Sequence, residues 1–209
     1  MEVEFGILER KELKEAVAFS LRAYEDYAYF VNFFPDVKER LRVLWAVMYR
    51  AWLTTFKKAR FLVAKVDGKM VGLAVLEPPH FKRPSVLQFL IHGWLQVYWG
   101  VNVRRMNNWI AMDEAAGKPC HDYQKSSPDI WYMSSLTVDP AFQGKGVGTK
   151  LVAFTEYYVR ERSADQLILF TNSEKNLAFY KNRGFEVFHE CEIAHDGKIM
   201  GSWSVKKKV

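Results

Sequence analysis

The stretch from Leu136 to Leu151 is the part of the sequence best suited to chemistry, and it reads LTVDPAFQGKGVGTKL. An apolar run stops at Asp139, glycines follow at positions 144, 146 and 148, and a helical apolar periodicity begins at once. Glycines let a backbone approach a ligand closely. The first turn of a helix offers free N–H groups at its positive end. This stretch therefore predicts a binding loop for a phosphate or pyrophosphate.

Two better-known glycine loops do not fit the spacing. A Walker A loop needs a glycine, four residues and then Gly-Lys-Ser/Thr, but counting from Gly144 places Thr149 where the second glycine belongs. A Rossmann loop follows the first strand of its domain, whereas this loop lies late in the chain and orders its glycines differently. A tight turn without any ligand is the remaining alternative.

The same stretch resembles the acetyl-CoA signature of the GNAT superfamily of N-acetyltransferases. That signature is Gln/Arg-x-x-Gly-x-Gly/Ala after a Leu-x-Val strand. It is met by Gln143, Gly146 and Gly148 behind Leu136 and Val138.

A second GNAT signature, an Asn followed by a helix with a Tyr and then Gly-Phe, is met by residues 176–185, NLAFYKNRGF. The order and separation of the two segments also match, and the strong resemblance covers roughly residues 131–187. It implies a single GNAT-like α/β (α+β) domain over residues 1–209. Its mixed, mostly antiparallel sheet would be flanked by helices, with two splayed central strands that hold acyl-CoA.

The resemblance implies acetyl-CoA as co-substrate. The backbone of Leu136, Thr137 and Val138 would bind its pantetheine arm as an added strand, and Asn176 would bond the same arm. The residues implied to hold the pyrophosphate are Gln143, Gly144, Lys145, Gly146, Val147, Gly148 and the hydroxyl of Thr149. For the adenosine phosphates, Lys145 or Lys150 is a candidate, with an ordinary surface lysine as the alternative.

Tyr180 is similar to the family's general acid, which protonates the departing thiolate of coenzyme A. A phenol with a pKa near 10 can give up that proton at neutral pH when it lies within hydrogen-bond reach of the sulfur. The alternative is a core aromatic side chain on a short helix. No metal is needed for direct attack by a neutral amine, and no histidines have metal-ligand spacing.

The general base is less clearly marked. Some family members carry a Glu where this chain has Tyr132. Upstream, on what we expect to be a loop, lie Glu114, His121, Asp122 and Asp129. His121 is the tentative base because its ordinary pKa is close to neutral. A water relay, or an amine that is already partly neutral, would serve equally.

Residues 131–140 are similar to the corresponding strand of puromycin-type acetyltransferases and related fungal and bacterial small-molecule enzymes, although Ile130 and Met133 depart from that pattern. This favours a small amine as acceptor. A protein or peptide N-acetyltransferase with the same chemistry, and a non-catalytic acyl-CoA sensor, are the alternatives.

The elements that must position these residues follow from periodicity and breakers. We expect strands at 3–8, 130–138 and 167–171, hairpins at 60–77 and 185–205, and helices at 9–29, 36–56, 85–116, 147–162 and 174–182. Asp67-Gly68 predicts a type I′ turn in the first hairpin, and His195-Asp196-Gly197 a turn in the last. The aromatic-rich residues 81–128, with Trp94 and Trp109, are expected to form an acceptor pocket or lid.

Composition narrows the function classes further. The formal net charge of +6 suits a polyphosphorylated partner, but the basic residues are scattered, so we expect no nucleic-acid binding. No signal peptide and no membrane span are expected, which favours a cytoplasmic protein. The two cysteines are expected to be free thiols. Aromatic residues between 89 and 109 leave a homodimer open.

Overall fold

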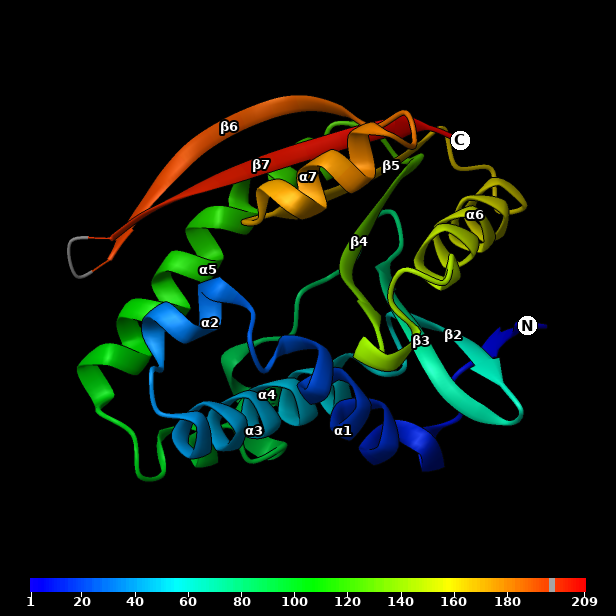
Figure 1. Cartoon of the computed structure of the whole chain (residues 1–209). Helices are drawn as coiled ribbons and strands as arrows, with labels where there is room; N and C mark the ends of the chain where they lie inside the picture. The colour runs from blue at the N-terminus through cyan, green and yellow to red at the C-terminus, as the bar shows by residue number, and fades with distance from the viewer. Residues whose placement is uncertain (196–197) are drawn as a thin grey trace.

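The computed structural model describes residues 1–195 and 198–209, and its core is one seven-stranded sheet in the order β1-β2-β3-β4-β5-β7-β6 (Figure 1). Neighbouring strands are antiparallel except β4 and β5, which are parallel. This confirms the predicted mixed, mostly antiparallel sheet. The strands are β1 (Glu4–Ile7), β2 (Arg60–Val66), β3 (Lys69–Glu77), β4 (Ile130–Val138), β5 (Gln166–Thr171), β6 (Glu186–His195) and β7 (Lys198–Lys208).

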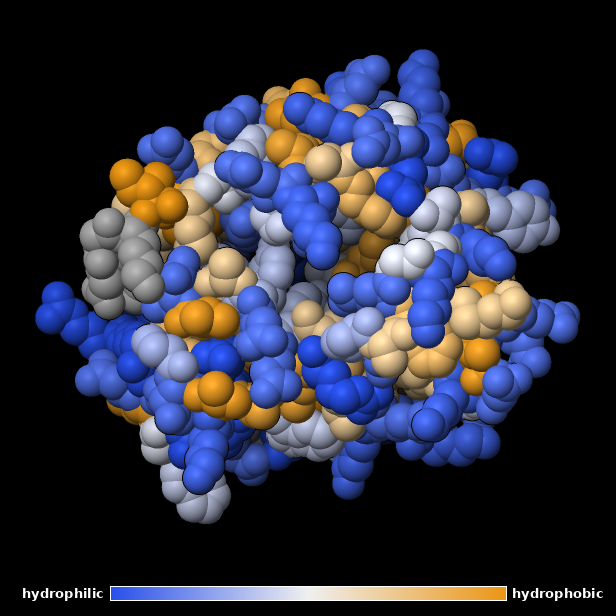
Figure 2. Space-filling view, viewed as in Figure 1, coloured by the Kyte–Doolittle hydropathy of each residue, from blue (hydrophilic) through white to orange (hydrophobic). Residues whose placement is uncertain are grey.

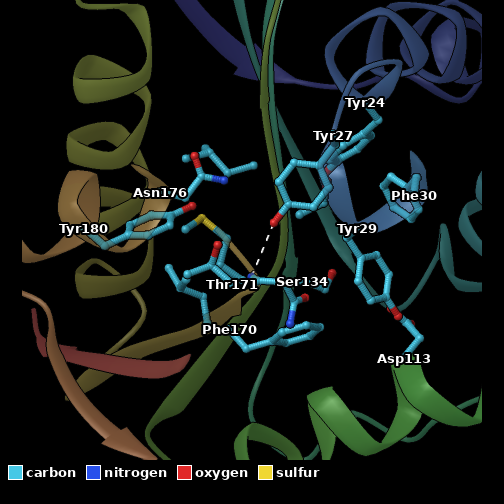
Figure 3. A pocket seen from close by; sticks show the side chains of 15 residues that line it. Tyr24, Tyr27, Tyr29, Phe30, Asp113, Ser134, Phe170, Thr171, Asn176 and Tyr180 are labelled. Atoms are coloured by element: carbon cyan, nitrogen blue, oxygen red, sulfur yellow. Dashed lines mark hydrogen bonds between the residues drawn. The ribbon is translucent and has the colours of Figure 1, made fainter. Parts of the chain in front are cut away.

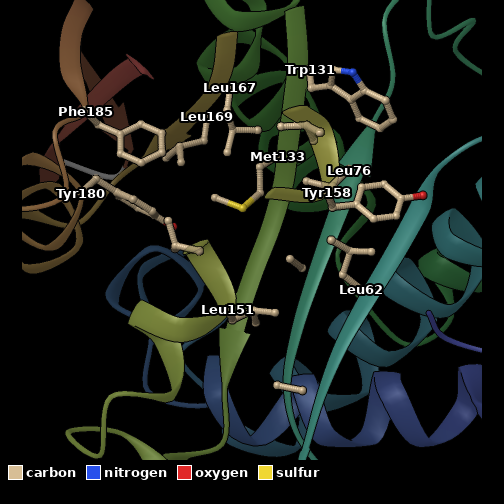
Figure 4. Packing of buried hydrophobic residues seen from close by; sticks show 14 of the residues in the cluster. Leu62, Leu76, Trp131, Met133, Leu151, Tyr158, Leu167, Leu169, Tyr180 and Phe185 are labelled. Atoms are coloured by element: carbon tan, nitrogen blue, oxygen red, sulfur yellow. The ribbon is translucent and has the colours of Figure 1, made fainter. Parts of the chain in front are cut away.

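Helices cover both faces of this sheet. They are α1 (Leu13–Tyr24), α2 (Ala28–Phe33), α3 (Val37–Thr55), α4 (Val86–Ile91), α5 (Val103–Gln124), α6 (Val147–Arg160) and α7 (Glu174–Lys181). Strand residues alternate between the faces, so Leu62 packs with Leu151 of α6 on one side, whereas Phe61 packs with Trp52 of α3 on the other. Figure 4 shows the first of these clusters, where α6 and α7 close over β3, β4 and β5.

The first hairpin forms as predicted. Asp67 and Gly68 both have left-handed backbones, with φ of 50° and 73°, which is what a type I′ turn requires. In the last hairpin, β6 and β7 pair from Glu186–Lys206 to His195–Lys198. Part of the turn predicted there, residues 196–197, lies outside the described residues.

The helix predicted over residues 9–29 is wrong in its extent, because α1 ends at Tyr24 and α2 starts at Ala28. The buried guanidinium of Arg40 explains the interruption. Its Nε donates to the carbonyl of Glu25 at 2.8 Å, and its Nη1 donates to the carbonyl of Phe34 at 2.6 Å. These carbonyls at helix ends would otherwise lack partners. The resulting turn places the aromatic residues of α2 against the centre of the molecule.

The continuous helix predicted over residues 85–116 is also wrong. Gly93 and Gly100 adopt left-handed backbones that separate α4, a short 3₁₀ helix and α5. Helix α5 then continues to Gln124, so Glu114, His121 and Asp122 lie on a helix and not on the expected loop. The side chain of Gln124 holds this end of α5 by donating to the carbonyls of Glu77, Pro78 and Ile130.

Both cysteines, Cys120 and Cys191, are free. Within residues 1–195 and 198–209, no helix combines the length and the apolar character that crossing a membrane requires. Exposed apolar side chains gather on α4 and the residues that follow it; they are Val86, Leu87, Ile91, Leu95 and Trp99.

Candidate active site

The central feature of the site is a gap between β4 and β5. The two strands pair only at their beginnings, from Ile130–Gln166 to Tyr132–Ile168. Beyond that point β4 continues to Val138, and β5 pairs with β7 on its other side. Among the described pairings, β4 residues 133–138 bond β3 alone. Their remaining backbone groups line a free strand edge that an extended ligand can pair with.

A β-bulge and helix α1 set the direction of this edge. Ser134 is the extra residue of β4, because the register passes from Val75–Ser135 directly to Leu76–Met133. From α1, the hydroxyl of Tyr24 lies 3.0 Å from that of Ser135, and Ser20 lies 3.3 Å from Thr137. The side chains of β4 are thereby fixed by α1 while its backbone edge stays open.

The predicted phosphate loop lies where β4 ends. Gly144 and Gly146 have φ of 74° and 80°, and a Cβ atom added at either would meet nothing within 4 Å. Gly146 caps the N-terminus of α6, and the first turn of α6 holds no acidic residue. A Cβ added at Gly148 would instead touch Phe179 at 3.4 Å and Val138 at 3.5 Å. The loop is therefore open toward solvent and closely packed at its base. It also lies in the positive electrostatic potential of the N-terminal end of α6.

The other predicted loop residues lie on or beside this surface. The side-chain amide of Gln143 donates to the carbonyl of Val138 at 3.2 Å and ties the loop to β4. The ammonium group of Lys145 lies 5.2 Å from the centre of the Phe142 ring. Lys150 is exposed one turn into α6.

Arg183 is a residue of this region that the sequence interpretation missed. Its guanidinium stacks 3.5 Å above the ring of Phe179 and donates to the Thr149 hydroxyl. A cation is thus held at the N-terminal end of α6, where an anionic ligand would sit. Arg183 lies in the turn after α7, and its Nη1 also donates to the carbonyl of Phe179 at 2.5 Å, which holds the guanidinium over that ring.

A cavity of about 140 Å³ opens inside the gap between the strands. Figure 2 shows this face of the molecule hollowed near its centre. Residues of six described elements line the cavity: α1, α2, α5, β4, β5 and α7. Of the residues predicted from sequence, Leu136, Asn176 and Tyr180 line it directly, and Thr137 and Val138 continue the same strand toward the phosphate loop.

Tyr180 and Asn176 form one side of the cavity (Figure 3). Both come from α7, whose N-cap Ser173 accepts from the backbone N–H of Asn176 at 3.4 Å. The ring of Tyr180 packs against Phe179 and Phe185. Burial raises the pKa of Tyr180 well above its usual value, so the phenol stays protonated at neutral pH.

Asp113 and Tyr29 form the opposite side of the cavity (Figure 3). The Tyr29 hydroxyl donates to the Asp113 carboxylate at 3.4 Å. Desolvation by the surrounding walls raises the pKa of Asp113 to about 6, although solvent reaches the side chain from the cleft. Sequence interpretation missed Asp113. Its signal was a charge in the middle of an apolar helical stripe that also contains Met106, Trp109, Ala116 and Cys120.

Aromatic rings connect the two sides. Tyr24 packs edge-on against Tyr27 and Phe30, with ring centres 6.0 and 5.3 Å apart. The Tyr27 hydroxyl accepts from the backbone N–H of Asn172 on β5 at 3.3 Å. Trp109 of α5 supports Phe30 from behind. These rings form the aromatic part of the cavity wall, beside the polar side chains of Ser134, Ser135 and Thr171.

His121 lies on α5 and is not among the residues that line the cavity. Its ring meets that of Tyr132 edge-on, 5.2 Å between centres. Burial lowers the pKa of His121 to about 3, so the imidazole is neutral but weakly basic. Among the described residues, no group of His, Cys, Asp and Glu side chains could hold a metal ion.

Comparisons with solved structures agree with this architecture. A protein from Corynebacterium glutamicum described as histone acetyltransferase HPA2 and related acetyltransferase aligns over 99% of this chain and 96% of its own, with a TM-score of 0.64 and 15% identity. A GCN5-related N-acetyltransferase from Rhodopseudomonas palustris aligns over 100% and 97%, with a TM-score of 0.60 and 14% identity. The PaiA N-acetyltransferase of Thermoplasma acidophilum, in complex with coenzyme A, aligns over 100% of both chains, with a TM-score of 0.59 and 13% identity.

At these identities the solved structures establish the fold alone. The family model for "Acetyltransferase (GNAT) family" matches residues 23–185, which is most of the chain. That span includes the splayed strands, the glycine loop and α7. The chain therefore belongs to the GNAT family of acetyltransferases.

Proposed function

We propose that this protein transfers an acetyl group from acetyl-CoA to the nitrogen of a small amine. The observation that carries the proposal is the gap between β4 and β5, with a glycine loop at its outer end and Tyr180 inside it. Family membership supports acetyl transfer, and one structural neighbour was solved with coenzyme A.

The residues present fit acetyl-CoA. The free edge of β4 at Leu136 and Val138 suits the amides of the pantetheine arm, which can pair with it as a strand does. The open loop at Gly144 and Gly146, with the N-terminus of α6, suits the pyrophosphate. The Thr149 hydroxyl with Arg183, and the nearby Lys145 and Lys150, add polar groups around it.

Acetyl-CoA supplies the acetyl group in activated form, as a thioester. Tyr180 is the proposed general acid, which donates its phenolic proton to the leaving sulfur. The desolvation that raises the pKa of Tyr180 also disfavours a thiolate in the same place, which offsets the weaker acidity of the buried phenol. A free backbone N–H of β4 would polarise the carbonyl oxygen of the thioester and hold the oxyanion that forms when the amine attacks.

Two acceptors are available for the proton that the amine loses. His121 stays a candidate base because burial keeps it neutral, but it would have to act through water, since it lies behind Tyr132 and outside the cavity lining. Water in the open cleft is the second acceptor, and we favour it because no intervening side chain separates it from the amine.

A small acceptor is favoured over a protein by the size and enclosure of the cavity. Its volume of about 140 Å³ is below that of pockets for drug-sized ligands, about 300–1,000 Å³. Helix α5, from the insertion at residues 81–128, closes one end with Asp113. A homodimer stays a prediction, supported by the exposed apolar side chains of α4.

The test is to incubate the protein with acetyl-CoA and a panel of small primary amines, amino acids and a lysine-containing peptide. Thiol release and the mass of each product are measured. Acetylated small amines would support the proposal. Turnover of the peptide alone would favour a protein acetyltransferase, and acetyl-CoA binding without any turnover would favour a sensor.

A further inference from the structure

The cavity has two ends that differ in chemistry, and only one of those ends is used by the proposed reaction. Tyr180 and Asn176 mark the reacting end (Figure 3). Asp113 marks the other end. The lining between them is mixed, with the rings of Tyr24 and Tyr27 beside the polar side chains of Ser134 and Thr171 (Figure 3).

Among the described residues that line the cavity, Asp113 is the one charged side chain. Its described hydrogen bond, from the Tyr29 hydroxyl, is long at 3.4 Å and occupies one carboxylate oxygen. Arg83 acts on this carboxylate electrostatically, but it lies outside the cavity and pairs with Glu77 at 3.9 Å. The carboxylate therefore retains acceptor capacity toward the cleft, where a ligand cation could use it.

Tyr24 and Tyr27 lie between the two ends. Tyr24 interacts with the Asp113 carboxylate, and Tyr180 interacts with Tyr24 and Tyr27. The aromatic residues thus stand between the acid and the reacting end, as Figure 3 shows. An acceptor that extends from Tyr180 to Asp113 passes along ring faces, which favour both methylene groups and cations.

We propose that the acceptor is a short aliphatic diamine, whose distal ammonium group is held by Asp113 while its other nitrogen is acetylated beside Tyr180. This rests on the proposed function and adds its substrate class. The near nitrogen bonds to the acetyl carbon, the carbon–sulfur bond breaks, and the sulfur takes the proton of Tyr180. The nitrogen then releases one proton, which restores the phenol through water. Asp113 does not take part in these steps and acts as a specificity residue.

Apolar burial alone would make pentylamine a better substrate than cadaverine. The proposal predicts the opposite preference. Pentylamine buries its methyl end in an apolar site at no cost, whereas the second ammonium group of cadaverine must be desolvated there unless it finds a partner. With Asp113 as that partner, a hydrogen bond to a charged group makes kcat/KM for cadaverine higher by about 10- to 100-fold.

The experiment compares cadaverine with pentylamine, and putrescine with butylamine, in the wild type, Asp113→Asn and Asp122→Asn. Asp122 lies on the same helix but outside the cavity, so its variant is the matched control. Thiol release gives kcat and KM, and calorimetric titration of cadaverine and pentylamine gives affinity without turnover. We expect the diamine preference to reside mainly in KM, to disappear in Asp113→Asn and to persist in Asp122→Asn.

Equal use of both amines by the wild type, or better use of the monoamine, would overturn the diamine inference while amine acetylation itself still stood. An equal loss of kcat for both amines in Asp113→Asn would overturn it as well, because it would make Asp113 a general base. If no amine is acetylated and acetyl-CoA does not bind, the proposed function fails together with the inference.

Discussion

The phosphate loop and the Asp113 end of the cavity are built in opposite ways. The loop is one short, exposed segment, and its shape comes from glycines at positions 144 and 146 that no other side chain crowds. The Asp113 end is made of side chains beside the open cleft, and its residues come from α2 and α5, which are far apart in the chain. A binding surface made of backbone can be encoded locally, whereas one made of side chains depends on tertiary packing.

The two regions also differ in how they treat charge. The loop presents N–H groups and cations to solvent, where little is lost by leaving them free. Around Asp113 the protein retains carboxylates that are costly to ionise: burial raises the pKa of Glu77 to about 7. Such perturbed groups are typical of functional sites. This difference agrees with the two proposals, anion binding at the loop and cation selection at the Asp113 end.

Tyr180 lies between the phosphate loop and the Asp113 end of the cavity, and we expect Tyr180→Phe to have the largest effect on kcat. Loss of a general acid lowers rates by about 100- to 10,000-fold. Because Tyr180 is proposed to act on the leaving sulfur, kcat should fall by this amount while the affinity for acetyl-CoA changes little. Steady-state kinetics and calorimetry measure the two quantities. A variant with near-normal kcat would remove Tyr180 from the mechanism.

Glu77→Gln tests whether carboxylates near the Asp113 end are costly to ionise. Within the described residues, Glu77 Oε2 is buried without a hydrogen-bond partner, and its side chain is 14% exposed. Burial raises the pKa of Glu77 in the folded protein. The cost of ionising Glu77 is therefore absent at low pH, where the carboxyl group is protonated in both the folded and the unfolded protein. It grows as pH rises from the ordinary pKa toward about 7.

The Glu77→Gln variant should therefore be more stable than the wild type near neutral pH, by about 1–3 kcal/mol, and equally stable near pH 4. Denaturant unfolding at both pH values measures this. Equal stability at both pH values would mean that Arg83, 3.9 Å from Glu77, or water offsets the cost of ionising this carboxylate in the folded protein.

Arg183→Gln tests the loop with a smaller expected effect. Removing the cation beside Thr149 should weaken acetyl-CoA binding by about 10-fold, as for loss of one partly exposed charged contact. Arg162→Gln is the matched control. Arg162 stacks 3.6 Å above Tyr158 and donates to the Tyr158 carbonyl, but it lies beyond the opposite end of α6. If the two variants bind acetyl-CoA alike, Arg183 is a structural residue only.

The sequence predicted the loop, the central strand and the mixed sheet because the signals for them lie in neighbouring residues. The type I′ turn at Asp67-Gly68 and the glycine cap of α6 are examples. It did not predict the break between α1 and α2, which depends on the carbonyl bonds that the distant Arg40 makes. Nor did it find Asp113, whose importance arises only when α5 packs beside Tyr29.

The central claim, that the loop and the gap between β4 and β5 bind acetyl-CoA, is tested most directly by calorimetric titration of acetyl-CoA into Gly146→Asp. This substitution strains a backbone with φ of 80° and adds a negative charge where the pyrophosphate is expected. Gly68→Asp, in a turn with φ of 73° and equally open space, is the matched control. We predict binding to the wild type and to Gly68→Asp, and none to Gly146→Asp. Equal affinity of all three, or no binding to folded wild type, would contradict the account.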